Sequence, residues 1–328
     1  MKNFTAFSHI DFEFVDGINV FAGENGTGKT HVLKILYAIQ KYFRDKKHSI
    51  FQEVFPGSFL IDTFSSIARG NANKIALSGQ WSGNTWNLNL DLISHGFWKE
   101  DLQTELELGE VPFAVFVPAT EMIGHTQGYL SISELYEIDF DVTYRDIVLR
   151  LLAPKLRDDS SLIQVAKDLE SPIGGTIELE MERFYVRSNG SRMAMPMVGE
   201  GIRKLATLHQ LLSNGMIRPG SVLLWDEPEA NLNPSLMDEL ISALLQISRA
   251  GVQIFLATHS YIILKELQLQ KTEEDKVRFF AFAKGEKPED GVTVKPANSY
   301  AEISPNPIAD QYLRLYDLEL DKRLGPKK

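Results

Sequence analysis

The chain contains no cysteine, which excludes disulfide bridges, cysteine-bound zinc sites and thiol catalysis. It has no uninterrupted apolar run of about 18 residues, the length that a membrane-spanning helix needs. The N-terminus also lacks the long apolar segment and small-residue cleavage site of a secretory signal. These absences predict a cytoplasmic protein that does not span a membrane.

Basic residues are outnumbered, with 34 Lys and Arg against 44 Asp and Glu, so the formal net charge is −10. This total argues against nonspecific nucleic-acid binding over the whole surface, but it leaves a local basic groove open. We find no internal repeat and no sustained heptad pattern, which excludes a long coiled coil. The 328 residues, 44% of them hydrophobic, suffice for one large domain with a sizeable core.

Apolar segments alternate with helical patterns along much of the chain. Strands that are apolar on both faces and alternate with helices are typical of a parallel sheet covered by helices. The sequence therefore predicts an α/β fold with a mostly parallel central sheet. The expected apolar strands are Ile10–Phe14, Ile18–Ala22, Pro112–Val117, Val222–Trp225, Val252–Ala257 and Val277–Ala283. The expected helices are Lys29–Phe43, Tyr144–Leu152, Glu200–Leu212, Pro234–Ile247, Tyr261–Leu267 and Pro307–Leu324.

Shorter alternating patterns indicate antiparallel strands. Lys74–Gly79 and Trp86–Leu92 alternate in the N-terminal third of the chain. Thr176–Glu180 and Arg183–Arg187 alternate like a hairpin, and Asn189-Gly190 is typical of a tight turn. We expect an N-terminal antiparallel portion beside the parallel sheet.

Residues 23–30 match the phosphate-binding pattern G-x-x-x-x-G-K-[ST] between an expected strand and an expected helix. Glycines let successive backbone N–H groups converge on phosphate oxygens, and the helix N-terminus adds a positive end. We expect Lys29 to reach the β- and γ-phosphates of ATP, and the Thr30 hydroxyl to ligate Mg²⁺. The predicted nucleotide-binding residues are Gly23, Glu24, Asn25, Gly26, Thr27, Gly28, Lys29 and Thr30.

Two carboxylates follow the apolar strand Val222–Trp225. Ligands of open α/β sheets bind beyond the carboxyl ends of the strands, so Asp226 and Glu227 are expected at the same edge as the phosphate loop. Asp226 is predicted to hold Mg²⁺ through water. Glu227 is predicted to accept a proton from the water that attacks the γ-phosphate.

A histidine follows the next apolar strand, in Ala257-Thr258-His259-Ser260. Its position on the same sheet edge predicts that His259 senses the γ-phosphate. Glu227, His259 and Lys29 are therefore the predicted catalytic residues.

Together these segments resemble an ABC-type ATPase head of the RecF, SMC and OLD-like branch, a P-loop NTPase fold that acts on DNA or in phage defence. The resemblance covers most of the chain and implies a helical lobe inserted into the ATPase. The matching segments are Gly17–Gly26, Gly23–Thr30, Pro118–Glu121, Asp226–Pro234, Ala257–Ser260 and Asn306–Ile308.

In that family two heads face each other head-to-tail and enclose two ATP molecules, so the resemblance implies a homodimer. Val198–Gly201 matches the signature loop, which implies that Gly199 and Gly201 contact the nucleotide of the partner head. Gly199 stands where the family has a serine, and Asn233 where many relatives have an aspartate. The family's lobe-junction glutamine has two candidates here, Glu121 and Gln127.

We expect a single ATPase domain over residues 1–328. Residues 1–120 would form the N-terminal part with the phosphate loop, 121–198 the inserted helical and signature lobe, and 199–328 the C-terminal part. The interval 121–198 is too short for a coiled-coil arm, and no second catalytic domain is visible after Val277. A complete ATPase without an output suggests an ATP-dependent regulatory or scaffold subunit of a bacterial anti-phage defence or toxin-like complex. A separate effector, such as a nuclease or toxin, would supply the output.

Three alternatives stay open. A RecF-like repair ATPase would act directly on DNA, which salt-dependent duplex binding would reveal. A nucleotide-binding subunit of a transporter would need an L-S-G-G-Q signature, which Val198–Gly201 does not match. A switch that binds ATP but barely hydrolyses it would fit the missing serine at Gly199.

Overall fold

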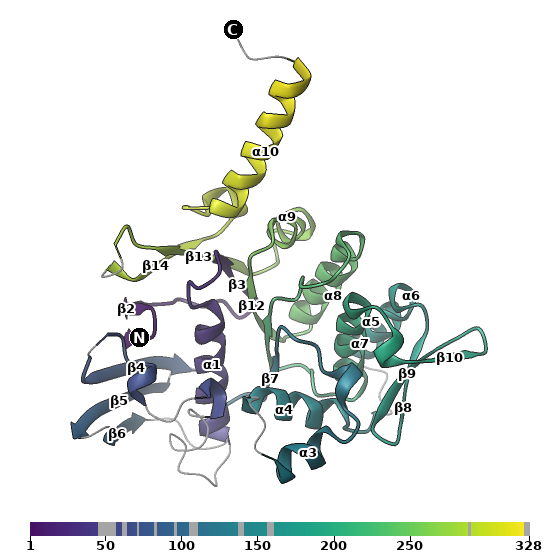
Figure 1. The fold of residues 1–328 in the computed structure, drawn as a ribbon, viewed down its shortest axis with the longest axis horizontal. Coiled ribbons are helices and arrows are strands. Elements are labelled where there is room, and N and C mark those ends of the chain that lie inside the picture. Colours follow the sequence, from purple (N-terminus) through teal and green to yellow (C-terminus); the bar gives the residue numbers. More distant parts are fainter. Residues whose placement is uncertain are drawn as a thin grey trace.

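The computed structural model describes residues 1–44, 57–60, 64–70, 72–81, 84–94, 97–104, 111–136, 141–155, 161–287 and 290–324. Within these ranges, six strands form the central sheet in the order β14-β13-β3-β12-β11-β7 (Figure 1). All neighbours are parallel except β14, which pairs antiparallel with β13 at one edge. The predicted mostly parallel α/β fold is confirmed. The strands are β3 (Ile18–Gly23), β7 (Ala114–Val117), β11 (Val222–Asp226), β12 (Gln253–Thr258), β13 (Val277–Lys284) and β14 (Val292–Ala297).

The central strands are buried on both faces, as their continuous apolar sequences require. On one face, alternate residues of β3, β11 and β12 join a core with α7, α8 and α9. On the other face, the remaining residues of these strands pack against α1 and the antiparallel sheet. The helices are α1 (Lys29–Arg44), α3 (Tyr129–Leu135), α4 (Val142–Leu151), α5 (Ser161–Asp168), α6 (Glu170–Ile173), α7 (Glu200–Ser213), α8 (Met237–Arg249), α9 (Tyr261–Gln270) and α10 (Pro307–Leu324).

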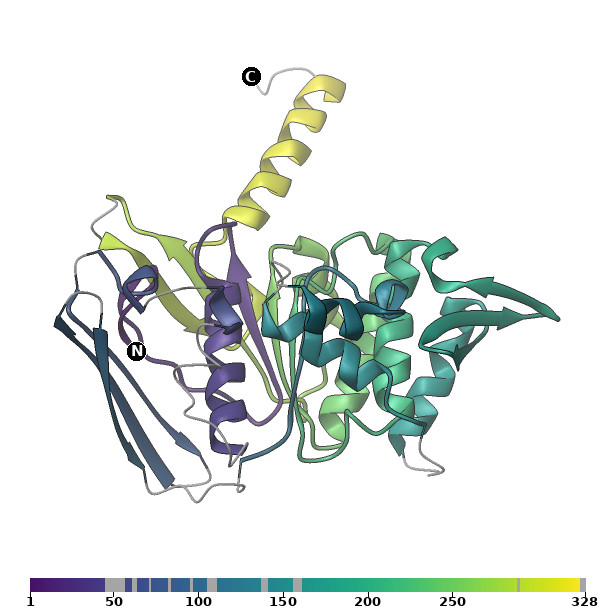
Figure 2. The same cartoon turned by 60° about the horizontal axis from the view of Figure 1, so that its bottom comes forward.

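Two antiparallel sheets flank the centre at opposite ends of the molecule (Figure 2). The larger has the order β2-β1-β4-β5-β6, and the smaller the order β10-β9-β8. The larger comprises β1 (Lys2–Phe4), β2 (Phe7–His9), β4 (Lys74–Trp81), β5 (Asn84–Ser94) and β6 (Phe97–Thr104). The smaller comprises β8 (Thr176–Glu180), β9 (Arg183–Ser188) and β10 (Ser191–Ala194). Residues 121–198 thus contain α3 to α6 and this sheet, while the division of the chain into three parts stays a prediction.

One expected strand is wrong. Ile10–Phe14 has no strand structure, because the antiparallel pairing is made earlier, between β1 and β2. The alternating rings of Phe12 and Phe14 stack on each other, with centroids 5.1 Å apart. Both also pack against Phe21 and Phe280 at the sheet. Their apolar alternation therefore reflects ring contacts made from a loop rather than from a strand.

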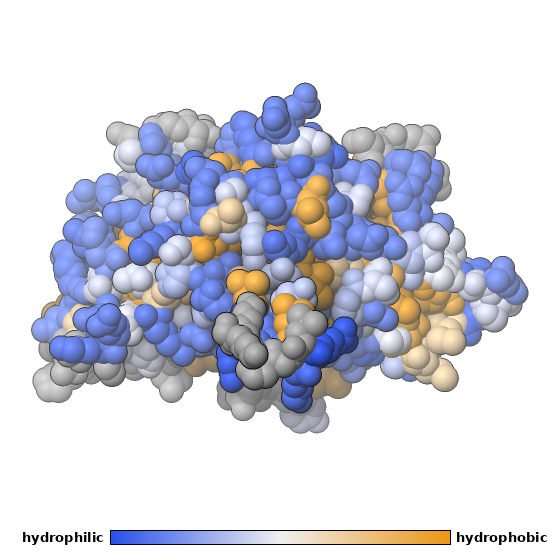
Figure 3. Space-filling view, turned by 90° about the horizontal axis from the view of Figure 1, so that it is seen from above, coloured by the Kyte–Doolittle hydropathy of each residue, from blue (hydrophilic) through white to orange (hydrophobic). Residues whose placement is uncertain are grey.

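The last helix, α10, projects away from the body (Figures 1 and 2). Seen from this end, the molecule has a mostly hydrophilic face with separate hydrophobic patches (Figure 3). No helix among the described residues is long and apolar enough to cross a membrane. Large apolar side chains are nevertheless exposed along the helix, at Tyr312, Leu313, Leu315, Tyr316 and Leu318.

Candidate functional site

The phosphate loop joins β3 to α1 and leaves no room for side chains at two of its glycines. A Cβ on Gly23 would lie 2.4 Å from the carbonyl oxygen of Phe282 on the neighbouring strand β13. Gly28 has a left-handed φ of +85°, and a Cβ there would lie 2.8 Å from the ring of Phe7. The glycines are thus required by backbone packing, which fixes the path of the loop around the start of α1.

Lys29, the first residue of α1, is buried and folded back over this loop. Its Nζ donates hydrogen bonds to the carbonyl oxygens of Gly23 and Glu24, each 2.8 Å away. The Thr27 hydroxyl donates to the same Glu24 carbonyl, also at 2.8 Å. Burial lowers the pKa of Lys29, while the nearby carboxylate of Glu227 opposes this change. The hydrogen bonds that hold the ammonium group inside the loop thus go to neutral carbonyls, with carboxylates nearby.

The next residue contacts the acidic pair. The Thr30 hydroxyl lies 3.0 and 2.9 Å from the two carboxylate oxygens of Asp226, the last residue of β11. Asp226 is buried, and this burial raises its pKa from 3.8 to about 6, against the opposing effect of the Thr30 hydrogen bond. The structure thus brings the two predicted magnesium ligands together.

Glu227 leaves the strand with a left-handed φ of +47°. Its N–H donates to the carbonyl of Ala257 at 2.9 Å. Lys204 of α7 donates from Nζ to the carbonyl of Glu227 at 2.6 Å. Lys204 is 2% exposed, and burial lowers its pKa. A buried lysine from the helical core therefore fixes the backbone that carries the predicted catalytic base.

His259 lies beside that base. Its Nδ1 is 3.3 Å from Oε1 of Glu227 and 3.7 Å from Oε1 of Glu229. Glu229 also accepts hydrogen bonds from the Thr258 hydroxyl at 2.6 Å and from the His259 N–H at 3.0 Å. The buried Glu229 carboxylate thus joins the loop after β11 to the loop after β12.

Neither Lys204 nor Glu229 was predicted as a site residue. Lys204 has only a weak sequence signal, because the buried face of α7 also carries the polar residues Thr207, His209 and Gln210. Glu229 stands two positions after the acidic pair and has no comparable signal, because an acidic residue in a loop is usually solvated.

The two glycines of the predicted signature loop have different surroundings. Gly199 caps α7, and a Cβ there would have no described atom within 4 Å. A Cβ on Gly201 would lie 2.5 Å from the carbonyl oxygen of Asn231 and 2.8 Å from the Cα of Leu232. Gly201 is therefore a packing glycine beside the loop after Glu227, whereas Gly199 faces open space.

The two candidates for the lobe-junction residue also differ. Glu121 is buried, lies 2.7 Å from the guanidinium of Arg203 on α7, and accepts the Gly124 N–H at 3.1 Å. Gln127 is exposed, and its side-chain oxygen accepts a hydrogen bond from Arg183 on β9. Glu121 is thus held in the interior against α7, and Gln127 lies at the surface.

Comparisons with known proteins agree with this geometry. A family model described as "AAA domain, putative AbiEii toxin, Type IV TA system" matches residues 126–265, and an AAA domain model matches residues 1–75. Among solved structures, an Smc head bound to the C-terminal winged-helix domain of ScpA has a TM-score of 0.57 at 12% identity. That match covers 90% of this chain and 95% of the other. AAA-domain models thus match two segments of the chain, and its fold is that of an SMC-type ATPase head.

A second structure has the same fold as this head. It is the Smc head domain with an extended coiled coil from Pyrococcus furiosus, bound to the C-terminal domain of ScpA. Its TM-score is 0.55 at 10% identity, and the match covers 96% of this chain and 97% of the other. No curated protein matches the sequence of the head. The phosphate loop falls within the match over residues 1–75, and Asp226, Glu227 and His259 fall within the match over residues 126–265.

Proposed function

We propose that this head binds ATP with Mg²⁺ and hydrolyses it. The observation that supports the proposal most directly is the contact between Thr30 and Asp226, because these residue types share the coordination of Mg²⁺ at P-loop sites. Mg²⁺ is usually held by one or two carboxylates together with substrate phosphates rather than by a full protein cage. The described residues contain no group of three or more potential His, Asp or Glu ligands, which agrees with that mode of binding.

The phosphate loop fits a triphosphate in two respects. Gly23 and Gly28 let the backbone follow a close-packed path that a Cβ would block, and along such a path backbone N–H groups can donate to phosphate oxygens. Lys29 is bonded to neutral carbonyls, so its charge is available to an anion that enters the loop. Its buried environment strengthens that attraction.

Glu227 and His259 are proposed to serve the chemical step. Mg²⁺, when bound, would neutralise phosphate charge beside Thr30 and Asp226. Glu227 would accept the proton of the attacking water at its carboxylate. His259 would orient that carboxylate from 3.3 Å, and Lys204 would hold its backbone. The position of Glu227 thus depends on His259 and Lys204, and a catalytic base must be positioned in this way to orient the attacking water.

We further propose an ATP-bridged homodimer in which the loop at Gly199 contacts the partner's nucleotide. Gly199 is exposed at the N-terminus of the 14-residue helix α7, whose first N–H groups can receive an anion. The contact between Gly201 and Asn231 supports coupling, because it links this loop to the segment after Glu227.

The output of the head is proposed to be a separate effector, as in an anti-phage or toxin-like complex. The similarity to the AbiEii-type AAA model is compatible with that role. The exposed apolar side chains of α10 supply a surface for a protein partner. The Smc heads of similar fold were solved with a domain of ScpA bound, which shows that this fold can carry a partner. A RecF-like role on DNA is the competing proposal.

The solution mass of Glu227→Gln, measured by light scattering with and without ATP and Mg²⁺, tests the proposal. Removing the base should abolish phosphate release and leave ATP bound, so the mass should double only with nucleotide. Glu273→Gln removes an exposed carboxylate and should behave like the wild type. Wild-type turnover by Glu227→Gln would refute the assigned base. A mass that is independent of ATP would refute the ATP-bridged dimer while leaving the ATPase intact.

A further inference from the structure

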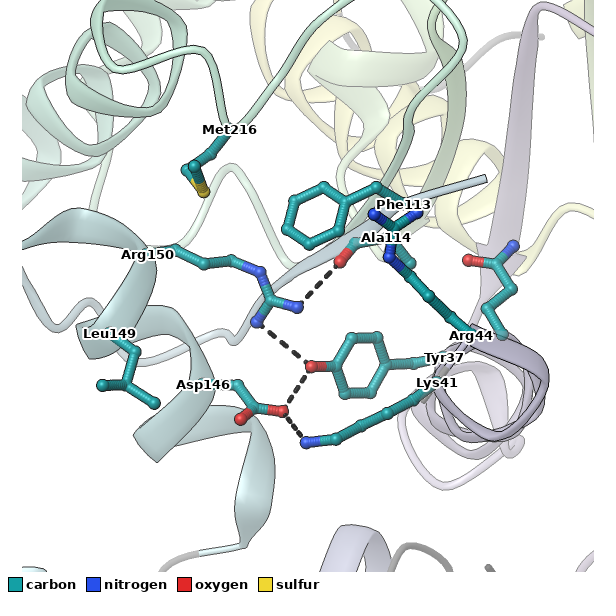
Figure 4. A pocket seen from close by; sticks show the side chains of 10 residues that line it. Tyr37, Lys41, Arg44, Phe113, Ala114, Asp146, Leu149, Arg150 and Met216 are labelled. Carbon is teal, nitrogen blue, oxygen red and sulfur yellow. Dashed lines mark hydrogen bonds and ion pairs between the residues drawn. The ribbon is translucent and has the colours of Figure 1, made fainter. Parts of the chain in front are cut away.

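A second cavity, lined by both charged and apolar side chains, lies at the opposite end of α1 from the phosphate loop. It has a volume of about 240 Å³ and is lined by residues of α1, α4 and the segment entering β7. Figure 4 shows Tyr37 and Lys41 from α1, Arg150 from α4 and the ring of Phe113 around it. None of these residues belongs to the proposed ATP site.

The cavity carries an excess of positive charge. Three cationic side chains, Lys41, Arg44 and Arg150, line it with the single carboxylate of Asp146. That carboxylate already accepts hydrogen bonds from Lys41 and from the Tyr37 hydroxyl. Asp146 is therefore occupied by one cation, and the two arginines are left without a carboxylate partner in the part of the chain that the structure describes.

The two arginines are held in place by neutral groups. Arg150 donates to the Tyr37 hydroxyl at 3.1 Å and to the carbonyl oxygen of Ala114 at 3.0 Å (Figure 4). The guanidinium carbons of Arg150 and Arg44 each lie 5.0 Å from the centroid of the Phe113 ring. Phe113 thus brings two guanidinium groups to one cavity without neutralising them.

A buried amide in the same cavity has unused hydrogen-bonding capacity. Gln40 is 2% exposed, and among the described residues neither its Oε1 nor its Nε2 has a hydrogen-bond partner. The buried Nε of Arg150 also has none. An unpaired buried polar group costs about 1–3 kcal/mol, so a native protein rarely keeps several together without a ligand or water to satisfy them.

We propose that this cavity binds the phosphate group of a small molecule, either inorganic phosphate or a small phosphorylated compound. Planar guanidinium groups match the oxygens of a phosphate, and an amide N–H can donate to a third oxygen. The volume suits a small ligand rather than a folded partner. The proposal does not depend on ATP hydrolysis. Arg44 and Lys29 are the last and first residues of α1, so a ligand bound at Arg44 would contact the helix that starts at the phosphate loop.

Calorimetric titration with inorganic phosphate tests the proposal, provided that the phosphate loop is disabled by Lys29→Ala. In that background we expect one phosphate to bind per chain. Adding Arg44→Gln should weaken the affinity at least about tenfold, since it removes a charge-assisted hydrogen bond. Arg44 is exposed at the end of α1, so the fold should be unaffected. Arg314→Gln, an exposed arginine on α10, is the matched control and should change nothing.

The proposal is overturned if phosphate does not bind in the Lys29→Ala background, or if Arg44→Gln and Arg314→Gln weaken it equally. Titration with adenosine monophosphate distinguishes the two sources of phosphate. If the cavity takes a phosphorylated compound, adenosine monophosphate should bind more tightly than inorganic phosphate, and if it takes the free ion, it should not. A short single-stranded oligonucleotide that binds more tightly still, and loses affinity with Arg44→Gln, would overturn the small-molecule assignment. Gln40→Leu gives a second readout. It should stabilise the free protein and reduce the rise in melting temperature that phosphate produces.

Discussion

The hydroxyl of Thr30 lies 2.9 Å from a carboxylate oxygen of Asp226, although 196 positions separate the two residues in the chain. The register of the sheet accounts for this meeting. β12 lies between β3 and β11 and aligns Thr258 with Ala22 on one side and Ala257 with Asp226 on the other. The three parallel strands therefore end at one edge, where the helix that follows β3 begins beside the acidic pair.

Asp226 is buried at this contact, so the stability of the nucleotide-free protein should depend on pH. The pKa is raised to about 6 by burial, so the folded protein takes up this proton at a higher pH than the unfolded chain. The charged carboxylate then destabilises the fold above about pH 6, and the cost disappears as the pH falls towards 4. Asp226→Asn should raise the free energy of unfolding by at most about 3 kcal/mol at neutral pH.

Urea unfolding of the nucleotide-free protein between about pH 4 and pH 8 checks this. The extra free energy of unfolding of Asp226→Asn over the wild type should shrink as the pH falls. Asp317→Asn, which removes an exposed carboxylate from α10, should show no such trend. An Asp226→Asn effect of equal size at every pH would contradict the assignment. With ATP present, the same variant should lose magnesium-dependent turnover.

Two glycines of the loop before α7 should respond in opposite ways to substitution. Gly201→Ala should destabilise the protein by about 1–3 kcal/mol, because its Cβ would meet backbone atoms of Asn231 and Leu232. Gly199→Ser has open space and a φ of −57°, so stability should be unchanged or slightly increased by a better helix cap.

Gly199→Ser should also strengthen ATP-dependent dimerisation, since it supplies a hydroxyl donor to the partner's nucleotide. Urea unfolding measures the first effect, and light scattering of the Glu227→Gln background measures the second. If the serine leaves the dimer unchanged while ATP still bridges two heads, Gly199 does not contact the nucleotide.

Prediction from the sequence succeeded for the segments whose local pattern matches the way they pack in the fold. The pattern of β3, loop and α1 was predicted closely, and the limits of α10 were predicted to the residue. Ile10–Phe14 failed because alternating rings can be buried from a loop as well as from a strand. The contact of Lys204 with the Glu227 carbonyl was not predicted, because periodicity shows that a helix is buried but not which carbonyl lies opposite.

Lys204 should act on turnover rather than on nucleotide binding. Lys204→Met keeps the length of the side chain and removes the hydrogen bond to the backbone carbonyl of Glu227. The backbone of Glu227 is then no longer fixed, so its carboxylate is less well positioned. We expect kcat to fall about tenfold or more with KM for ATP nearly unchanged, because the phosphate loop is untouched. Steady-state phosphate release measures both.

Lys271→Met is the matched control, because this exposed lysine also donates to a backbone carbonyl, that of Asn298 at 3.0 Å. It should leave kcat unchanged. A purely structural role for Lys204 would instead lower the melting temperature without separating kcat from KM.

The projecting helix α10 should be required for the effector and not for ATP turnover. Its base is anchored at α9, where the rings of Tyr312 and Tyr261 stack with centroids 4.6 Å apart. Tyr261 starts α9 two residues after His259, so α10 packs against the segment that follows the proposed γ-phosphate sensor. Beyond that anchor, Leu315 is 53% exposed. Leu315→Glu should abolish capture of a second polypeptide from the native host while ATP hydrolysis stays at the wild-type rate.

Gln311→Glu adds the same charge to the same helix without removing an apolar side chain, so it should keep the partner. Co-purification followed by mass spectrometry identifies what is retained, and phosphate release reports the ATPase. If the wild type in its active state carries no second polypeptide, the effector proposal fails. If Leu315→Glu retains the partner as well as Gln311→Glu does, the partner docks elsewhere on the head. If duplex DNA binds in a salt-dependent way instead, the RecF-like role is favoured.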